Sequence, residues 1–284
     1  MSYFWLDLNE FIKLALEEDG VSEDHTSLAC IDKGSEGKAE LLIKEDGVIA
    51  GVEAAKNIFN YLDEKFIIEK FVEDGQKVKN GNVGFIVSGS MLNILKAERL
   101  VLNIMQRMSG IATETSKYVE QLQGLKTKVL DTRKTTPLFR AFEKWAVKIG
   151  GGENHRMGLN DMILIKDNHV DFADGIEKAI DKVHDYLKRT NKKIKVEIET
   201  RNLSEVNQVL KKGSVNRIML DNFKIPELTE AVKIINHQYE TEASGGITLK
   251  NIRMYAETGV DFVSVGSLTH SYKSLDLSLK AKKN

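Results

Sequence analysis

Residues 195–221, KVEIETRNLSEVNQVLKKGSVNRIMLD, carry the pattern that decides the fold. A short run rich in β-branched residues ends near Glu199, an amphipathic helical pattern starts near Leu203, and a second apolar run ends near Asp221. A strand, a helix and a second strand in this order are typical of a βα unit in a parallel sheet.

The same alternation repeats over the chain beyond Gly110. Six strands are expected to end near Asp131, Lys166, Glu199, Asp221, Ala243 and Val265, with helices following at roughly Pro137, Asp174, Leu203, Pro226, Thr248 and Leu268. Pro137 and Pro226 are both expected at helix starts. Because about 160 residues are too few for eight full units, we predict an open or incomplete α/β barrel of about six βα units over residues 112–272.

The first third of the chain predicts a mixed helix and strand scaffold. Apolar residues recur at helical spacing from Phe4 to Ala15, until Asp19-Gly20 ends the pattern. Further on we expect, in order, strands at residues 38–43 and 47–51 and a long helix over residues 92–108 that breaks at Ser109-Gly110. We assign residues 1–111 to an N-terminal α+β sandwich domain, on which residues 273–284 pack back.

Composition limits the possible functions. The chain has 284 residues, of which 42% are hydrophobic, and its 41 basic and 42 acidic residues nearly cancel. No overall field therefore attracts nucleic acid or an anionic membrane. The acidic residues among the first twenty are unlike a signal peptide, and no apolar run is long enough to span a bilayer, so we expect a cytoplasmic protein. Cys30, the one cysteine, excludes an intramolecular disulfide and is expected to be structural.

Charged side chains follow the predicted strands where each strand ends. Arg133 and Lys134 come after the first strand, Lys166 after the second, and Glu199 and Asp221 close the third and fourth. The carboxyl ends of barrel strands meet at one mouth, where such enzymes perform their chemistry. We therefore favour an active site over a solvated basic face for the segment Asp131–His169, which also contains Lys148, His155 and Arg156.

Two glycine loops after the last strands predict a phosphate site. Glu242-Ala-Ser-Gly-Gly246 and Val265-Gly-Ser267 each precede a predicted helix, and the final loops of a barrel often bind phosphate. The run Gly150–Gly152 is not a P-loop, because no Lys-Ser or Lys-Thr pair follows it.

The carboxylates of Glu199 and Asp221 have several possible roles. They would bind magnesium, hold sugar hydroxyls or stabilise positive charge on a sugar carbon, or else form structural ion pairs. For Glu197, which lies further from the strand end, we expect only a structural ion pair.

Several motifs resemble the quinolinate phosphoribosyltransferase family over essentially the whole chain. They are Gly47–Gly51, Glu98–Asn103, Ser109–Thr113, Asp131–Pro137, Gly150–Arg156, Leu164–His169, Met219–Phe223 and Glu242–Ile247. Two departures are small: Leu138 stands where the family commonly has glycine, and Glu23–Thr26 replaces a typical Gly-Asp-x-Thr.

The resemblance implies a type II phosphoribosyltransferase-like fold and two anionic substrates, quinolinate and phosphoribosyl pyrophosphate (PRPP), with Mg²⁺. It implies that Arg133, His155 and Arg156 hold the quinolinate carboxylates and that Lys134 and Lys166 connect quinolinate to the pyrophosphate. Glu199 and Asp221 would hold the ribose or the metal. The 5-phosphate would lie on Ser244, Gly245, Gly246, Gly266 and Ser267.

The resemblance also implies a homodimer with shared active sites, in which Arg99 enters the neighbouring subunit's site, and which can assemble further into a hexamer. Three alternatives stay open. The first is a related phosphoribosyltransferase that uses nicotinate, nicotinamide or another pyridine carboxylate. The second is a barrel lyase or isomerase with a Schiff-base lysine at Lys166. The third is a catalytically inactive relative.

Overall fold

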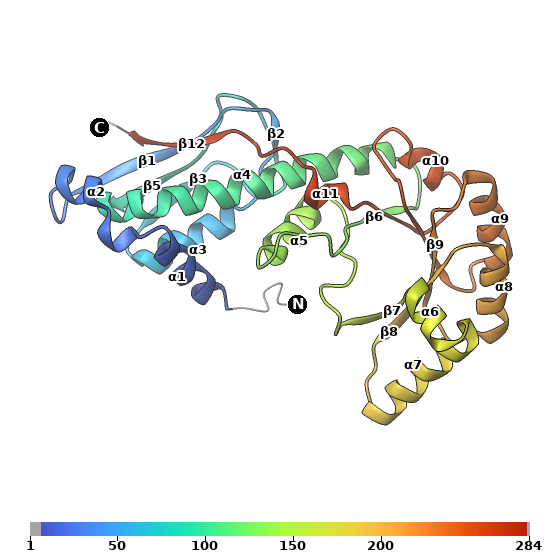
Figure 1. Cartoon of the computed structure of the whole chain (residues 1–284). Helices are drawn as coiled ribbons and strands as arrows, with labels where there is room; N and C mark the ends of the chain where they lie inside the picture. Colours follow the sequence, from blue (N-terminus) through green and yellow to red (C-terminus); the bar gives the residue numbers. More distant parts are fainter. Residues whose placement is uncertain (1–6, 283–284) are drawn as a thin grey trace. The chain divides into compact units, whose positions relative to one another are not determined.

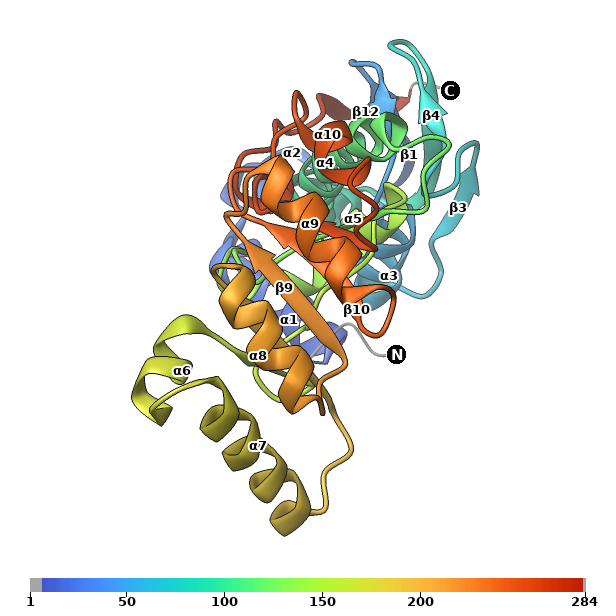
Figure 2. The ribbon, with the colours of Figure 1, turned by 90° about the vertical axis from the view of Figure 1, so that its right-hand side faces the viewer.

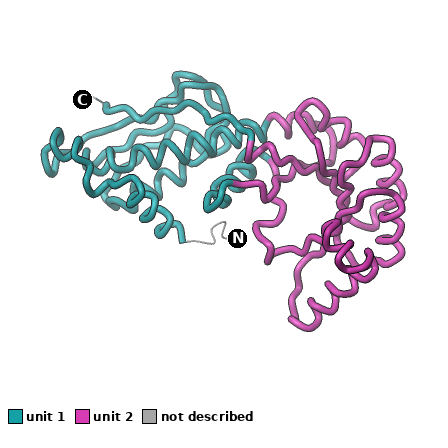
Figure 3. The backbone as a smooth tube through the Cα atoms, viewed as in Figure 1, with its two compact units in different colours: residues 1–116, 136–151, 271–284 teal, residues 117–135, 152–270 magenta. Residues whose placement is uncertain are grey.

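The computed structural model describes residues 7–282 of the chain, so Phe4 of the first predicted helix lies outside the described residues. Two compact units, coloured differently in Figure 3, make up the chain. Unit 1 contains the residues up to Ser116, residues 136–151 and the residues from Ser271 onward, whereas unit 2 contains residues 117–135 and 152–270. Each unit is built on a sheet of its own.

The sheet of unit 1 has the order β12-β1-β5-β3. All its pairs are antiparallel. Its strands are β1 (Glu36–Ile43), β3 (Ile67–Lys70), β5 (Val83–Ser90) and β12 (Leu277–Lys282). A separate small ladder joins β2 (Gly47–Val48) to β4 (Lys77–Val78). The last strand of the chain thus joins a sheet formed by the first third, next to Lys38–Ile43 of β1.

The helices of unit 1 lie along one side of this sheet (Figure 1). Apart from the helix within residues 136–151, they are α1 (Leu8–Glu18), a 3-10 turn (Val21–Glu23), α2 (His25–Cys30), α3 (Val52–Leu62) and α4 (Met91–Gln121), whose last residues belong to unit 2. The carboxylate of Asp7 caps α1 by accepting hydrogen bonds from the amides of Asn9 and Glu10. Cys30, expected to be structural, lies exposed at the end of α2.

The helix expected to break at Ser109-Gly110 continues to Gln121, so that prediction is wrong. The buried hydroxyl of Ser109 accepts from the amide of Ala50 at 2.9 Å and donates to its carbonyl at 3.1 Å. A Cβ atom on Gly110 would lie 2.2 Å from the carbonyl oxygen of Lys273. These small residues therefore let α4 pack closely against neighbouring backbone instead of ending it.

Residues 136–151 pack within unit 1, although they fall inside the range expected for the barrel. The rings of Phe139 and Phe142 lie 6.1 and 4.9 Å from the ring of Phe11. Arg107 donates from Nε to the fully buried carboxylate of Glu143 at 2.9 Å. Aromatic packing and a buried ion pair thus hold this segment, and neither is visible in strand and helix periodicity.

The helix in that segment, α5 (Arg140–Ile149), begins after Pro137. Pro137 lies in the turn before the helix, so the expectation that it starts a helix is wrong. Pro226 does stand in the first turn of α9 (Ile225–Ile235), as predicted. A fixed proline φ suits both positions, because the first helical turn and many β-turns use the same φ value.

Unit 2 is built on a six-stranded parallel sheet with the order β6-β11-β10-β9-β8-β7. The strands are β6 (Lys128–Leu130), β7 (Met162–Ile165), β8 (Lys195–Thr200), β9 (Arg217–Asp221), β10 (Glu240–Ser244) and β11 (Phe262–Ser264). Strands β6 and β7, consecutive in the chain, stand at opposite edges, so the sheet does not close. The predicted open α/β barrel of six units is confirmed.

Helices cover the outside of this sheet, as Figure 1 and Figure 2 show for α7, α8 and α9. Beside α9, the helices of unit 2 are α6 (Asp167–Ala173), α7 (Ile176–Thr190), α8 (Leu203–Lys212), α10 (Ile252–Ala256) and α11 (Ser267–His270). Among the described residues, no helix has the length and apolar character needed to cross a membrane.

The two faces of the sheet in unit 2 differ in character. On β8, Val196 and Ile198 are buried apolar residues, whereas Glu197 and Glu199 point to the other face, because successive strand side chains alternate. In the register of the sheet, Glu197 lies opposite Arg217 on β9, and Arg217 lies opposite Glu240 on β10. The inner face of the open barrel is therefore lined by charged side chains, and the apolar core lies under the helices.

Candidate active site

A pocket of about 770 Å³ lies within unit 2 at the carboxyl ends of its strands. Its lining includes every residue predicted for the site except Arg99, which belongs to unit 1: Arg133, Lys134, His155, Arg156, Lys166, Glu199, Asp221, Ser244, Gly245, Gly246, Gly266 and Ser267. The residues predicted at the strand ends thus lie together around one cavity. The part that each of them plays there stays a prediction.

Arg133 and Lys134 follow β6, where the chain leaves the sheet. The segment is fixed from both sides: Thr132 accepts from the amide of Lys134 at 3.1 Å, and the buried hydroxyl of Thr269 donates to the Lys134 carbonyl at 2.8 Å. Among the residues that the structure describes, no hydrogen-bond partner is found for the buried Nε of Arg133. A guanidinium with a buried, unused donor at the edge of a pocket is suited to bind an anion.

Lys166 and Glu199 face each other across neighbouring strands, with 3.8 Å between Nζ and Oε2. The lysine side chain is half exposed, whereas that of Glu199 is 11% exposed. Burial, and next the neighbouring carboxylate of Asp221, raise the pKa of Glu199. Two carboxylates that repel each other in this way, beside a loosely held lysine, are a suitable pair of ligands for a divalent cation.

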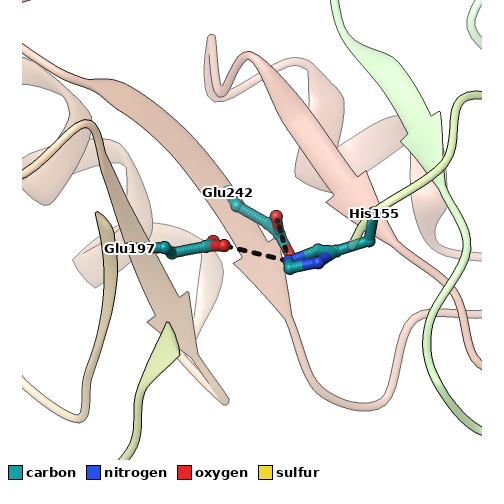
Figure 4. Close-up of side chains that lie close together, drawn as sticks. All are labelled: His155, Glu197 and Glu242. Carbon is teal, nitrogen blue, oxygen red and sulfur yellow. Dashed lines mark ion pairs between the residues drawn. The ribbon is translucent and has the colours of Figure 1, made fainter. Parts of the chain in front are cut away.

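A second group of charges lies deeper, and Figure 4 shows its three central members. Nε2 of His155 lies 3.0 Å from Oε2 of Glu197 on β8 and 3.4 Å from Oε2 of Glu242 on β10. Both glutamates are fully buried. On β9, Arg217 completes the group by pairing with Glu242 at 3.0 Å. The ion pair expected for Glu197 is therefore present, and the partner of Glu197 in it is His155.

The loop between α5 and β7 brings His155 to this group. The fully buried carboxylate of Asp131 accepts from the amide of His155 at 2.9 Å and from the side-chain amide of Asn154 at 2.5 Å. The loop also forms an isolated parallel bridge between Glu153 and Leu130 of β6. The loop thus lies along one of the two open edges of the sheet.

The pKa values in this group depend on one another. Burial lowers the pKa of His155, but Glu197 and Glu242 outweigh it and raise the pKa to about 9. Burial, and next the repulsion from Glu242, raise the pKa of Glu197 to about 7. The amide of Arg156 donates to Nδ1 of His155 at 2.7 Å, which opposes a second proton on the ring. We infer that one additional proton is shared between His155 and the two carboxylates, which leaves the group of four side chains, Arg217 included, neutral overall.

The spacing of His155, Glu197 and Glu242 also fits a metal ion, since their ligand atoms lie within 4.8 Å of one another. However, the guanidinium of Arg217 already compensates Glu242, and burial of that carboxylate is outweighed by His155, Arg217 and Ser264, which lower its pKa. We therefore assign the group as an ion-pair network, and the pair Glu199 and Asp221 as the better candidate for a metal.

The first glycine loop has the backbone that a close approach to a ligand needs. Gly245 and Gly246 have φ values of +94° and +64°, and a Cβ atom on Gly245 would lie 2.2 Å from Oδ1 of Asn222. In the second loop, Tyr118 and Ser267 share a hydrogen bond of 3.2 Å between their hydroxyl groups. Because α10 begins only at Ile252, the donors for an anion at the first loop are backbone N–H groups of the loop itself.

Two residues of the segment Asp131–His169 lie elsewhere. Lys148 lies exposed on α5 in unit 1, and the ring of His169 accepts from the amide of Lys166 at the start of α6. Conversely, Glu242 and His270 line the pocket without having been predicted as site residues. For Glu242 a signal was available, because it alternates with Ser244 on β10 and so faces the same side.

An open parallel α/β barrel with a cationic pocket at its strand ends, two carboxylates and two glycine loops defines an enzyme class. Such a protein binds a phosphorylated, multiply anionic substrate and transfers or releases part of it.

The comparisons with known proteins give the family. Residues 24–109 match the family model of the N-terminal domain of quinolinate phosphoribosyl transferase, and residues 111–280 match that of its C-terminal domain. The chain therefore belongs to the quinolinate phosphoribosyltransferase family. The family resemblance predicted from the sequence motifs is confirmed.

Similar proteins agree along almost the whole chain. A mitochondrial quinolinate phosphoribosyltransferase (decarboxylating) of Nicotiana tabacum is 47% identical, over 96% of this chain and 82% of that protein. The structure of NadC from Streptococcus pyogenes is 37% identical with a TM-score of 0.91, and covers 97% of both chains. The nicotinate-nucleotide pyrophosphorylase of Francisella tularensis is 38% identical with a TM-score of 0.89, over 97% of this chain and 96% of that one.

Proposed function

We propose that this chain transfers the phosphoribosyl group of PRPP to quinolinate and releases nicotinate mononucleotide, pyrophosphate and CO2, a step of NAD biosynthesis. The observation that carries the proposal is the pocket of unit 2, where Arg133, Lys134, Arg156 and Lys166 surround a single cavity. Burial, and next the neighbouring Arg133, lower the pKa of Arg156, which reflects cations held close together. Two substrates that each carry several negative charges fit such a lining.

In the proposed arrangement the guanidinium groups of Arg133 and Arg156 hold the quinolinate carboxylates, because their planar forks match carboxylates. His155 lies beside Arg156 on the same loop. Lys134 and Lys166 reach the pyrophosphate as mobile point charges, and the loops with Gly245 and Gly266 hold the 5-phosphate.

The chemistry follows from these positions. The pyridine nitrogen of quinolinate bonds to the anomeric carbon of the ribose while the bond from that carbon to pyrophosphate breaks. Glu199 and Asp221 face the transient positive charge on the sugar or its hydroxyls. The new positive charge on the ring nitrogen then stabilises the electron pair left on the adjacent ring carbon when its carboxylate departs as CO2. That carbon then takes a proton from solvent, which completes nicotinate mononucleotide.

Magnesium is part of the proposal. Glu199 and Asp221 are the side chains that would hold it, and when bound it would neutralise charge on the pyrophosphate. The support is the raised pKa of Glu199, caused first by burial and next by Asp221. Removal of Mg²⁺ by a chelator should abolish turnover, and its return should restore it.

Substrate choice tests the proposal against its nearest alternative. Turnover is measured with quinolinate and with nicotinate, each with PRPP and Mg²⁺. We expect turnover on quinolinate only, since a monocarboxylate leaves part of the cationic lining without a partner. Turnover on nicotinate without turnover on quinolinate would refute the proposal. Borohydride trapping of substrate on Lys166 would support a Schiff-base lyase instead.

A homodimer with shared active sites is the proposed assembly, and a hexamer of such dimers is its possible extension. Arg99 lies exposed on α4, and Leu95, one turn earlier on the helix, is also exposed. An exposed cation beside an exposed apolar residue suits a subunit interface.

Mixing of inactive variants tests this assembly. If Arg99 serves the neighbouring site, a hybrid of an Arg99→Ala chain and a Lys134→Ala chain has one intact site, and activity returns on mixing. As a control, Lys134→Ala and Lys166→Ala chains should stay inactive when mixed, because both residues line the same pocket. No recovery in the first mixture would exclude shared sites.

A cytoplasmic location completes the proposal. The exposed free thiol of Cys30 supports it, since such thiols persist in reducing compartments. Cell fractionation with an antibody against the chain tests the location.

A further inference from the structure

We propose that Glu242, Glu197 and Arg217 position His155 and, through it, the loop that carries Arg156 at the pocket. The two glutamates and Arg217 are therefore positioning residues for quinolinate. This inference rests on the proposed function and deepens it, because it assigns a role to buried charges beneath the substrate.

Both ring nitrogens of His155 already have partners within the protein. Nδ1 accepts from the amide of Arg156 at 2.7 Å, and Nε2 lies 3.0 Å from Glu197 and 3.4 Å from Glu242. The ring therefore directs neither nitrogen at a ligand in this arrangement. Its contacts instead connect two central strands of the sheet to the backbone of the residue that follows it.

The carboxylates that hold the ring are themselves held. The guanidinium of Arg217 pairs with Glu242 at 3.0 Å, and its central carbon lies 4.1 Å from the centre of the Phe262 ring. Glu197 and Glu242 are fully buried, so they have no access to water that could replace a lost partner. Removal of one charge would leave the others uncompensated, which ties the position of the ring to the complete network.

The loop that carries Arg156 depends on such anchors, because residues 152–161 contain no helix or strand beyond the single bridge at Glu153. Its other anchors include the bonds to Asp131, one from Arg156 Nη1 to the carbonyl of Met162 at 3.2 Å and the ion pair of Glu153 with Lys128. The network also lies directly beneath the site, since Glu242, His155 and Arg156 are among the residues that line the pocket. If the network only stabilised the fold, its disruption would affect the binding of both substrates rather than that of quinolinate alone.

Steady-state kinetics of Glu242→Gln tests the inference. The change keeps the size of the side chain and removes its charge. We expect the KM for quinolinate to rise by about tenfold or more, with the KM for PRPP within about threefold of its original value. Glu240→Gln is the matched control: Glu240 also pairs with Arg217, at 3.2 Å, but is 40% exposed and does not line the pocket. It should leave both KM values unchanged.

Glu197→Gln and Glu242→Asp extend the test. Glu197→Gln should repeat the selective rise, and Glu242→Asp, which keeps the charge, should return part of the quinolinate affinity. If Glu242→Gln does not fold, Glu242→Asp becomes the deciding variant and must raise the KM for quinolinate alone. An unchanged quinolinate KM in the folded variants, or an equal rise in both KM values, would overturn the inference. Absence of quinolinate turnover in the unsubstituted protein would instead refute the proposed function.

Discussion

Two layers of charge on the inner face of unit 2 differ in burial and pairing. At the strand ends, Lys134 is exposed and Lys166 is half exposed, with a loose contact of 3.8 Å to Glu199. Two residues deeper, Glu197 and Glu242 are fully buried and contact His155 and Arg217 at 3.0 to 3.4 Å. The outer layer leaves charge available for ligands, and the inner layer uses its charge within the protein. Outer-layer substitutions should therefore lower activity with little change in stability, whereas inner-layer substitutions should change both stability and quinolinate affinity.

The largest effect should come from the outer layer. Lys134→Ala removes an exposed cation at the pocket, so we expect kcat/KM to fall by on the order of 1000-fold with little change in thermal stability. Lys148→Ala is the control, because Lys148 comes from the same charged segment but lies exposed on α5. Activity near the original level in Lys134→Ala would mean that the site is assigned incorrectly.

The inner layer should govern the dependence of stability on pH. The pKa of His155 is raised to about 9 in the folded chain, from an ordinary value of 6.5. The stabilisation is therefore complete below pH 6.5 and is lost as the pH rises through about 9. One pKa unit corresponds to about 1.4 kcal/mol, so the free energy of unfolding should fall by on the order of 3 kcal/mol over this range.

Denaturant unfolding at a series of pH values measures this fall. His155→Gln, which has no titrating ring, should show a flatter profile between pH 6.5 and 9. The same slope in both proteins would mean that His155 does not hold an additional proton in the folded state.

The glycine loop should respond to a single methyl group. Gly245→Ala would bring a Cβ atom to 2.2 Å from Asn222 at a φ of +94°, which displaces the loop. We expect the KM for PRPP to rise by about 10- to 100-fold, measured at saturating quinolinate. Gly124→Ala has a similar φ of +84° and open space around it, so it should cost stability alone. Equal PRPP affinity in both variants would argue against a phosphate at this loop.

The smallest effect is expected at the opposite end of β8. Lys195 is 62% exposed and lies 3.7 Å from Glu240. Lys195→Ala should change the free energy of unfolding by less than about 1 kcal/mol and leave turnover unchanged, because exposed ion pairs are weak. A large loss of activity would extend the functional region beyond the pocket.

The sequence predicted the outer layer well, because strand ends can be located from periodicity alone. The residues after Leu130, Ile165 and Leu220 were therefore grouped correctly, and all line one pocket. Family motifs added quinolinate and PRPP as the expected substrates. The open sheet followed from the number of strands that the chain length permits.

The inner layer was predicted only in part, because it depends on contacts between distant segments. An ion pair was expected for Glu197, but nothing local identifies His155, which lies 42 positions earlier in the chain, as its partner, or adds Glu242 to the pair. The continuation of α4 through Ser109-Gly110 was missed for a similar reason. The glycine there serves close packing on Lys273, which lies far along the chain. Tertiary packing thus allows a helix to continue through residues that local sequence rules predict to end it.

A product balance tests the central claim most directly. The chain is supplied with PRPP, Mg²⁺ and quinolinate that carries an isotopic label in the carboxylate next to the ring nitrogen. The account predicts one labelled CO2 and one pyrophosphate for each nicotinate mononucleotide formed. Release of pyrophosphate without labelled CO2, or no consumption of quinolinate at all, would contradict it.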